Sequence, residues 1–219
     1  MRALALMARR QVLAIRGLEH VQPARDPFIL ALNHSTMAES LLVPALLMLH
    51  RGGRLIHFLA DWNYGLIPGV GLLYRRGETI LVTRKPARPR LLNALKPLYT
   101  HPLSALDRAR LLLAIGRPVG IFPEAKINRN AHRLLPARRG AALLSLESGV
   151  PVVPAGIRFP GLESGGRIGD RAAMEVHIGA PLTPPSALTA LADLYAWHDA
   201  IMSEIGRLCG KSYQSGARR

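Results

Sequence analysis

Residues 28–40 read FILALNHSTMAES: an apolar run, a polar turn and the start of a second apolar segment. The run at 28–32 is typical of a buried strand. The segment at 39–49 has a helical pattern and ends at Arg51-Gly52-Gly53. A buried strand that leads into a helix is the repeating unit of α/β proteins, so this stretch sets the expected fold class.

The same alternation continues along the chain, with no internal repeat and no long linker. We therefore predict one α/β domain over 1–219, with a Gly/Pro-broken loop or short helical turn at 66–73 and a flexible tail at 211–219. A last helix is predicted from a cap at Ser186 to near Gly210. The other strands are predicted at 55–59, 80–83, 119–122, 152–158 and 174–178, and the other helices at 104–116 and 139–148.

The composition is that of a globular protein, with 49% hydrophobic and 20% charged residues in 219. Aromatic residues make up only 5%, which argues against single-stranded nucleic acid as a partner, since such proteins stack bases on aromatic rings. The single cysteine, Cys209, excludes an intrachain disulfide and a cysteine-based metal site.

The formal net charge is +15, from 29 Lys and Arg against 14 Asp and Glu. Such a field attracts anions, including anionic membranes, phosphorylated ligands and acidic carrier proteins. An Arg-rich source composition explains the charge equally well. No motif supports nucleic-acid binding, so we expect none.

The N-terminal residues 1–14 are apolar but interrupted by Arg9 and Arg10, so they do not resemble a secretory signal. They fit a short basic amphipathic helix on a membrane, or an ordinary first helix packed on the domain. We expect a cytoplasmic protein, or one bound peripherally to the inner membrane face, because no run approaches the ~18 apolar residues of a span.

His34 and Glu39 form the first candidate site. A neutral His beside a carboxylate can take a proton from a substrate hydroxyl, while the acid fixes the tautomer and stabilises the imidazolium. The alternative is a polar turn after a strand, in which Glu39 only complements the helix dipole.

A second cluster, IFPEAKINRN at 121–130, brings an acid and two cations to the end of a predicted strand. Glu124, Lys126 and Arg129 are its candidate binding residues, and Arg84 ends another strand in the same way. Ligands of α/β proteins gather beyond the carboxyl ends of strands. A solvated loop is the alternative.

Together these segments resemble the glycerolipid acyltransferase superfamily, whose best-known members acylate lysophosphatidic acid. The resemblance spans about residues 15–182 in four ordered blocks. An Asn-His-x4-Asp block is matched by Asn33, His34 and, with a change, Glu39. The other matches are Pro68, Gly71, Gly77 and Arg84 for the second block, Phe122-Pro123-Glu124 with Pro136 to Gly140 for the third, and Val150 to Pro154 for the fourth.

The resemblance implies a mixed, mostly parallel central sheet flanked by helices, like that of glycerol-3-phosphate acyltransferase. It implies acyl transfer from acyl-CoA or acyl-carrier protein to an alcohol, with His34 as general base, Glu39 orienting it, and neither metal nor cofactor. Asn33 belongs to the same block and is a substrate-binding candidate. Arg84 and Glu124 would bind the acceptor, a lysophospholipid or a related unusual lipid.

The chain departs from the family pattern in the acceptor-facing blocks. Ile127 stands where the third block has Arg, so Lys126 or Arg129 would supply the cation, and Asp61 stands where Lys is frequent. An acceptor other than plain lysophosphatidic acid would fit. Two alternatives stay open: a carrier-protein-dependent acyltransferase or thioester hydrolase of specialised metabolism, and a non-catalytic basic module.

Overall fold

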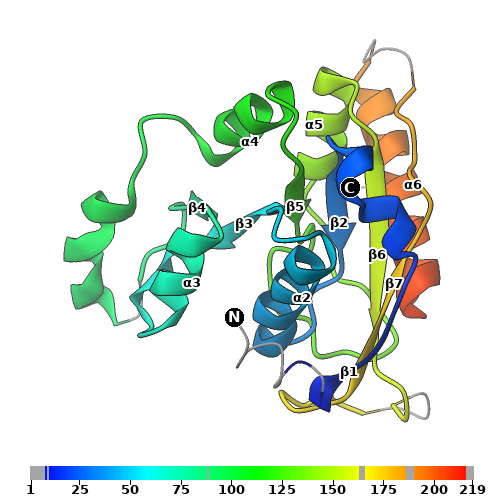
Figure 1. Cartoon of the computed structure of the whole chain (residues 1–219), viewed down its shortest axis with the longest axis horizontal. Coiled ribbons are helices and arrows are strands. Elements are labelled where there is room, and N and C mark those ends of the chain that lie inside the picture. Colours follow the sequence, from blue (N-terminus) through cyan, green and yellow to red (C-terminus); the bar gives the residue numbers. More distant parts are fainter. Residues whose placement is uncertain (1–7, 9, 88, 163–165, 186–189, 216–219) are drawn as a thin grey trace.

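The computed structural model describes residues 8, 10–87, 89–162, 166–185 and 190–215. Within these residues, one seven-stranded sheet has the order β1-β7-β6-β2-β5-β3-β4 (Figure 1). The strands are β1 Val12–Arg16, β2 Ile29–Leu32, β3 His57–Asp61, β4 Ile80–Val82, β5 Val119–Ile121, β6 Val152–Arg158 and β7 Met174–Ile178.

The sheet is mixed and mostly parallel, as predicted. β2, β3, β4, β5 and β6 run parallel to one another, whereas β7 pairs antiparallel with β6, and β1 pairs parallel with β7. Parallel neighbours need crossover connections, and the helices between the strands supply them. The carboxyl ends of five strands therefore share one edge of the sheet.

Helices cover both faces of the sheet (Figure 1). One face carries Leu30, Leu32 and Phe58, which pack with Val43 and Leu47 of α2. The opposite face carries the other side chains of the same strands and packs against α4, α5 and α6. The helices are α2 Met37–His50, α3 Val70–Arg76, α4 Ala105–Ala114, α5 Gly140–Ser148 and α6 Leu191–Cys209, with 3₁₀ segments η1 Leu18–Val21, η2 Pro23–Arg25, η3 Trp62–Leu66 and η4 Arg90–Tyr99.

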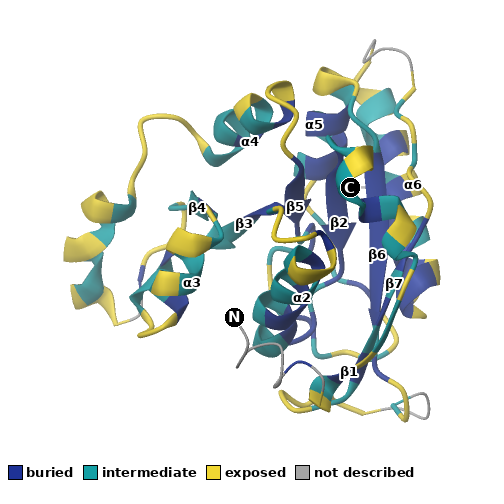
Figure 2. Cartoon of the chain, in the orientation of Figure 1, coloured by how far each residue is buried: buried dark blue, intermediate teal, exposed yellow. Residues whose placement is uncertain are grey.

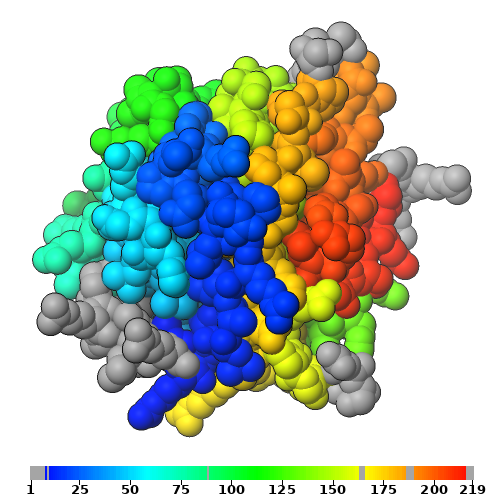
Figure 3. Space-filling model, turned by 45° about the vertical axis from the view of Figure 1, so that its right-hand side comes forward, coloured from blue at the N-terminus to red at the C-terminus, as the bar shows by residue number. Residues whose placement is uncertain are grey.

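The continuous burial of the central strands shows why both faces of the sheet need cover. In Figure 2, β2, β5 and β6 are dark blue along their length, and every residue of β2 is buried. In Figure 3, the N-terminal part of the chain (blue) runs over the middle of the view, between cyan residues and the orange and red of α6.

The structure corrects two predictions at the chain ends. Residues 12–14 belong to β1, not to an N-terminal helix, because they pair with β7; residues 1–7 and 9 lie outside the described residues. Residues 211–215 are not a free tail: Lys211 is buried, and the backbone of Ser212 donates to the carbonyl oxygen of His132 and accepts from the N–H of Leu134. Ser186 lies outside the described residues, and α6 begins at Leu191.

A lobe at the edge of the sheet contains β4, α3, η3 and η4. Trp62 at the start of η3 is fully buried, and its Nε1 donates to the carbonyl oxygen of Lys85 at 2.9 Å. Its ring also lies 5.5 Å from that of Tyr99, which anchors the end of η4. The sequence did not predict η4, because its prolines and cations favour a loop.

At Gly156 the end of α6 packs directly against the backbone of β6. A Cβ atom built at Gly156 would lie 2.2 Å from the backbone nitrogen of Cys209 and 2.3 Å from the carbonyl carbon of Leu208. Backbone atoms cannot move aside as a flexible side chain can, so only glycine fits here.

We predict that Gly156→Ala lowers the free energy of unfolding by roughly 3 kcal/mol, because overpacking must push α6 away from β6. The control is Gly169→Ala, since Gly169 is exposed and an added Cβ would meet no atom within 4 Å. Urea unfolding of both variants measures the difference. Equal stability of the two variants would contradict the packing argument.

Candidate active site

The polar residues that follow the parallel strands meet at the carboxyl edge of the sheet. His34 follows β2, Asp61 ends β3, Arg84 follows β4, and Phe122 follows β5. Each side chain comes from a different strand, so the site exists only after the sheet has formed. Strand ends at this edge are the usual ligand sites of α/β folds.

His34 and Glu39 are in direct contact. The Nδ1 atom of His34 lies 3.0 Å from Oε1 of Glu39, whose side chain is completely buried. The same oxygen accepts a hydrogen bond from the backbone N–H of Ser35. The polar-turn alternative does not require such a contact, and the geometry has the form that the proton-transfer hypothesis needs.

The start of α2 places Glu39 beneath the histidine. Thr36 is the N-cap, and its hydroxyl accepts a hydrogen bond from the backbone N–H of Glu39 at 3.3 Å. Glu39 is therefore the third helical residue, from which a side chain reaches back over the first turn. Asn33 fixes the other end of the turn, because its amide exchanges hydrogen bonds with the backbone of Ile157 at 2.7 and 3.2 Å.

Glu124 braces the backbone around His34. Its Oε1 accepts the backbone N–H of His34 at 3.0 Å, and its Oε2 accepts Asn128 Nδ2 at 2.7 Å and the backbone N–H of Leu135 at 2.8 Å. Burial raises the pKa of this carboxyl, while the three hydrogen bonds and nearby Lys211 act in the opposite direction. Both oxygens of Glu124 thus have partners within the protein.

The turn that carries Glu124 ends in a left-handed residue. Ala125 has a φ of 53°, and its N–H donates to the carbonyl oxygen of Phe122 at 3.0 Å. Glycine adopts such a φ without strain, whereas a residue with a Cβ atom does so at a cost. The backbone of Ala125 is therefore strained. Its carbonyl oxygen accepts a hydrogen bond from Lys85 Nζ at 3.1 Å.

Lys211 is buried next to the His34 turn, and the sequence did not identify it as a site residue. Its Nζ donates to Ser35 Oγ at 2.8 Å, and the side chain is buried beside Glu124 and Glu39. Burial lowers the pKa of Lys211 below its ordinary value, and the two carboxylates offset only part of this effect. No local pattern identifies this lysine, because it reaches Ser35 from the far end of the chain.

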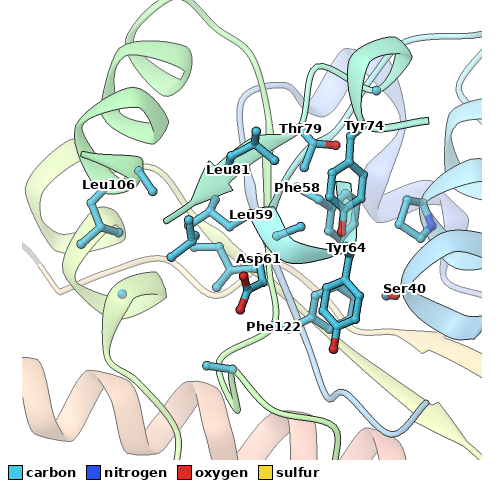
Figure 4. A pocket seen from close by; sticks show the side chains of 18 of the residues that line it. Ser40, Phe58, Leu59, Asp61, Tyr64, Tyr74, Thr79, Leu81, Leu106 and Phe122 are labelled. Carbon is cyan, nitrogen blue, oxygen red and sulfur yellow. The ribbon is translucent and has the colours of Figure 1, made fainter. Parts of the chain in front are cut away.

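A pocket of about 770 Å³ opens beside His34 and extends along both faces of the β3–β4 edge. Figure 4 shows Leu59 and Leu81 on the side of Leu106, and Phe58 and Tyr74 on the side of α2. Successive residues of a strand face opposite sides, so β3 lines both parts of the pocket. The ring of Phe122 packs against both His34 and Phe58, with its centroid 4.7 Å from that of the imidazole and 5.7 Å from that of Phe58.

Several polar side chains are among the residues that line the pocket. Arg84 and Lys126 line it and are exposed, and Asp61 forms an ion pair with Lys85 at 3.5 Å. Tyr74 faces the pocket, and its pKa is raised by burial and by the nearby groups Tyr64 and Asp61. The wall is otherwise mainly apolar.

The predicted site residues divide into two groups. His34, Arg84 and Lys126 line the pocket, whereas Asn33, Glu39, Glu124 and Arg129 are not among its lining residues. Arg129 donates to Asp170 at 2.5 Å and to the carbonyl oxygen of Ile168 at 2.9 Å. Its guanidinium is thus engaged elsewhere.

Two further searches cover only the part of the chain that the structure describes. None of its helices has the length and apolar character to cross a bilayer. It also contains no group of three or more His, Cys, Asp or Glu side chains placed to hold a metal ion.

A family model and a solved structure that match this chain both belong to acyltransferases. The model of the family described as "Acyltransferase" matches residues 12–158. The fold is similar to the crystal structure of the 1-acyl-sn-glycerophosphate acyltransferase PlsC from Thermotoga maritima, with a TM-score of 0.61 and 18% sequence identity over 94% of this chain and 78% of that chain. No curated protein sequence matches.

We predict that Lys211→Met lowers the free energy of unfolding by roughly 3 kcal/mol at pH 8, because two buried carboxylates lose their cation. The loss should shrink toward pH 5. Without the cation, the pKa of Glu124 rises further above its ordinary value of 4.5. The folded variant then binds a proton that the unfolded chain releases, so falling pH favours folding.

Urea unfolding at several pH values between 5 and 8 measures this change. The control, Lys126→Met, removes an exposed cation and should change stability by less than about 0.5 kcal/mol. A loss for Lys211→Met that does not depend on pH would contradict the electrostatic explanation.

Proposed function

The chain belongs to the acyltransferase family, and on that premise we propose that it transfers an acyl group from a thioester to an acceptor hydroxyl, with His34 as general base. The single observation that carries the proposal is the contact of 3.0 Å between His34 Nδ1 and the buried carboxylate of Glu39, at the wall of an apolar pocket.

The contact assigns roles to the two ring nitrogens. Glu39 accepts a hydrogen bond from the protonated Nδ1. Nε2 is therefore the unprotonated nitrogen, and it faces the acceptor hydroxyl. Nε2 takes the proton of the acceptor hydroxyl as its oxygen attacks the thioester carbonyl. The carbon–sulfur bond then breaks, and the leaving thiolate takes the proton back from the imidazolium, whose charge Glu39 stabilises until then.

The pocket suits the two substrates in different ways. The apolar wall formed by residues such as Leu59, Leu81 and Leu106 would hold an acyl chain. The donor is an acyl-CoA or an acyl-carrier protein. Both donors carry phosphate on the pantetheine arm. The exposed side chains of Arg84 and Lys126, which line the pocket, would attract that negative charge. An acidic carrier protein would also suit a chain with a net charge of +15.

The acceptor is a lysophospholipid or a related lipid with a different head group. Asp61, which stands where the resembling family often has Lys, forms an ion pair with Lys85 at 3.5 Å inside the pocket. Ile127, in place of an Arg, also lines it. These two changes remove positive charge from the acceptor side and favour a head group with hydroxyls over one that is only a phosphate monoester.

We predict that His34→Ala lowers kcat/KM for acyl transfer by roughly 10³-fold, the usual contribution of a general base. The control is His50→Ala, at the exposed end of the same helix. The assay measures thiol release from acyl-CoA and from acyl-carrier protein, together with mass spectrometry of the acylated acceptor. Thiol release by the wild type without any acylated product would support hydrolysis, and full transfer by His34→Ala would rule out the proposed base.

We further predict that Lys126→Ala raises KM for a phosphate-bearing substrate about tenfold, since a charge-assisted hydrogen bond contributes roughly 1.5 kcal/mol. Arg129→Ala is the matched control, because Arg129 is bound to Asp170 outside the pocket wall. Steady-state kinetics with donor and acceptor varied in turn shows which substrate Lys126 contacts. A larger effect of Arg129→Ala would reverse the assignment.

A further inference from the structure

The segment η4 exposes an apolar face that no part of the described chain covers. Leu91, Leu95 and Leu98 are 74%, 39% and 80% exposed, and none of the η4 residues is buried. Because η4 is a 3₁₀ segment with three residues per turn, Leu95 and Leu98 lie on one side and Leu91 on the neighbouring side, and both of these sides are exposed. In Figure 2, the segment appears in yellow and teal at the outer end of the lobe.

The opposite side of η4 attaches it to the lobe. The ring of Tyr99 packs on Trp62, and the side chain of Asn93 accepts a hydrogen bond from the backbone N–H of Ala87 at 2.8 Å. The segment is thus held in place from within while its leucines point outward. Exposed apolar patches with a polar rim are typical of surfaces that bind a partner or a membrane.

The charge around these leucines has one sign. The sequence of residues 79–106 contains five Lys or Arg and no Asp or Glu. Arg90 and Lys96 lie within η4 itself, at exposed and partly buried positions. A segment with outward-facing leucines and cations beside them has the composition of elements that lie in the head-group region of anionic bilayers.

The segments on both sides of η4 line the pocket, so membrane binding by η4 would place the pocket close to the lipid. The residues just before the segment, Arg84 and Lys85, line the pocket, and so do His101 and Leu103 just after it. The chain therefore leaves the pocket rim, forms η4 and returns to the rim. A surface that binds η4 would lie next to the mouth of the pocket.

We propose that the Leu91–Leu95–Leu98 face of η4, with Arg90 and Lys96, docks the protein on an anionic bilayer and brings the pocket mouth to the lipid surface. The leucines enter the boundary between head groups and acyl chains, and the cations contact lipid phosphates. Lipid substrates then enter the pocket without crossing bulk water. Docking itself does not depend on the proposed reaction, whereas its effect on turnover rests on the proposed function.

The test is co-sedimentation with vesicles of phosphatidylcholine, with and without phosphatidylglycerol. The wild type should bind the anionic vesicles and release them as salt concentration rises. The double variant Leu91→Gln/Leu98→Gln should bind at least about tenfold more weakly, since each leucine loses its burial in the lipid. Replacing Arg90 by Gln should weaken binding roughly fivefold.

The matched control is Leu111→Gln/Ile115→Gln, which removes two other exposed apolar side chains, 56% and 68% exposed, from the region of α4. It should bind like the wild type. Circular-dichroism melting should give the same Tm for both double variants, because the replaced leucines are exposed. Equal vesicle binding by both double variants would overturn the proposal.

Two other results would also overturn it. Self-association that the η4 double variant abolishes, without vesicle binding, would make the face an interface between copies. Binding of an acidic carrier protein with the same pattern would make it a protein docking site. Vesicle binding as predicted, with no transfer activity from any donor, would leave the docking intact and reject only the proposed function.

Discussion

The backbone N–H of His34 donates to a buried carboxylate oxygen of Glu124, and much of the site depends on this contact. The carbonyl oxygen of His34 accepts the backbone N–H of Asn128 at 2.7 Å, so both backbone groups of the histidine are bound to the loop that follows β5. That loop carries Phe122, whose ring lies against the imidazole. The histidine is thus held by a carboxylate 90 residues away in sequence.

This arrangement concentrates charge in the interior. Glu39 and Glu124 are buried on either side of the His34 turn, and Lys211 is the cation that faces both. Buried ion pairs add little net stability, because desolvation offsets their attraction, but an unpaired member is costly. The main effect of these three charged groups is therefore to fix the geometry of the turn that carries His34. These groups also explain why the end of α6 and the residues after it pack against the domain.

The sequence predicted the central strands well, because β2, β5 and β6 are short apolar runs bounded by turns. It predicted the His34–Glu39 pair from residue type and spacing, and the resemblance identified the loop after β5. It failed for β1, whose pairing with β7 joins distant parts of the chain, and for Lys211, whose partner lies 176 residues away. Local periodicity contains no information about such pairings.

Sequence reasoning also gave Glu124 and Arg129 the same kind of role as Lys126, since all three are charged residues at one strand end. Only the structure distinguishes them. Glu124 uses both oxygens to hold the loop, Arg129 is bound to Asp170, and Lys126 lines the pocket. A charged side chain near a strand end can brace the backbone or bind a ligand, and its residue type alone does not tell which.

The glutamate at position 39 follows from the way α2 begins. In a usual capping box, the acid at the third helical position binds the backbone N–H of the N-cap residue. Here Oε1 of Glu39 reaches one residue further back, to the N–H of Ser35, and contacts Nδ1 of His34. An aspartate would be one methylene too short for both partners unless α2 began closer to the histidine. One oxygen therefore contacts both the imidazole and the backbone N–H of Ser35, so the carboxylate that faces His34 is itself held in place by the backbone.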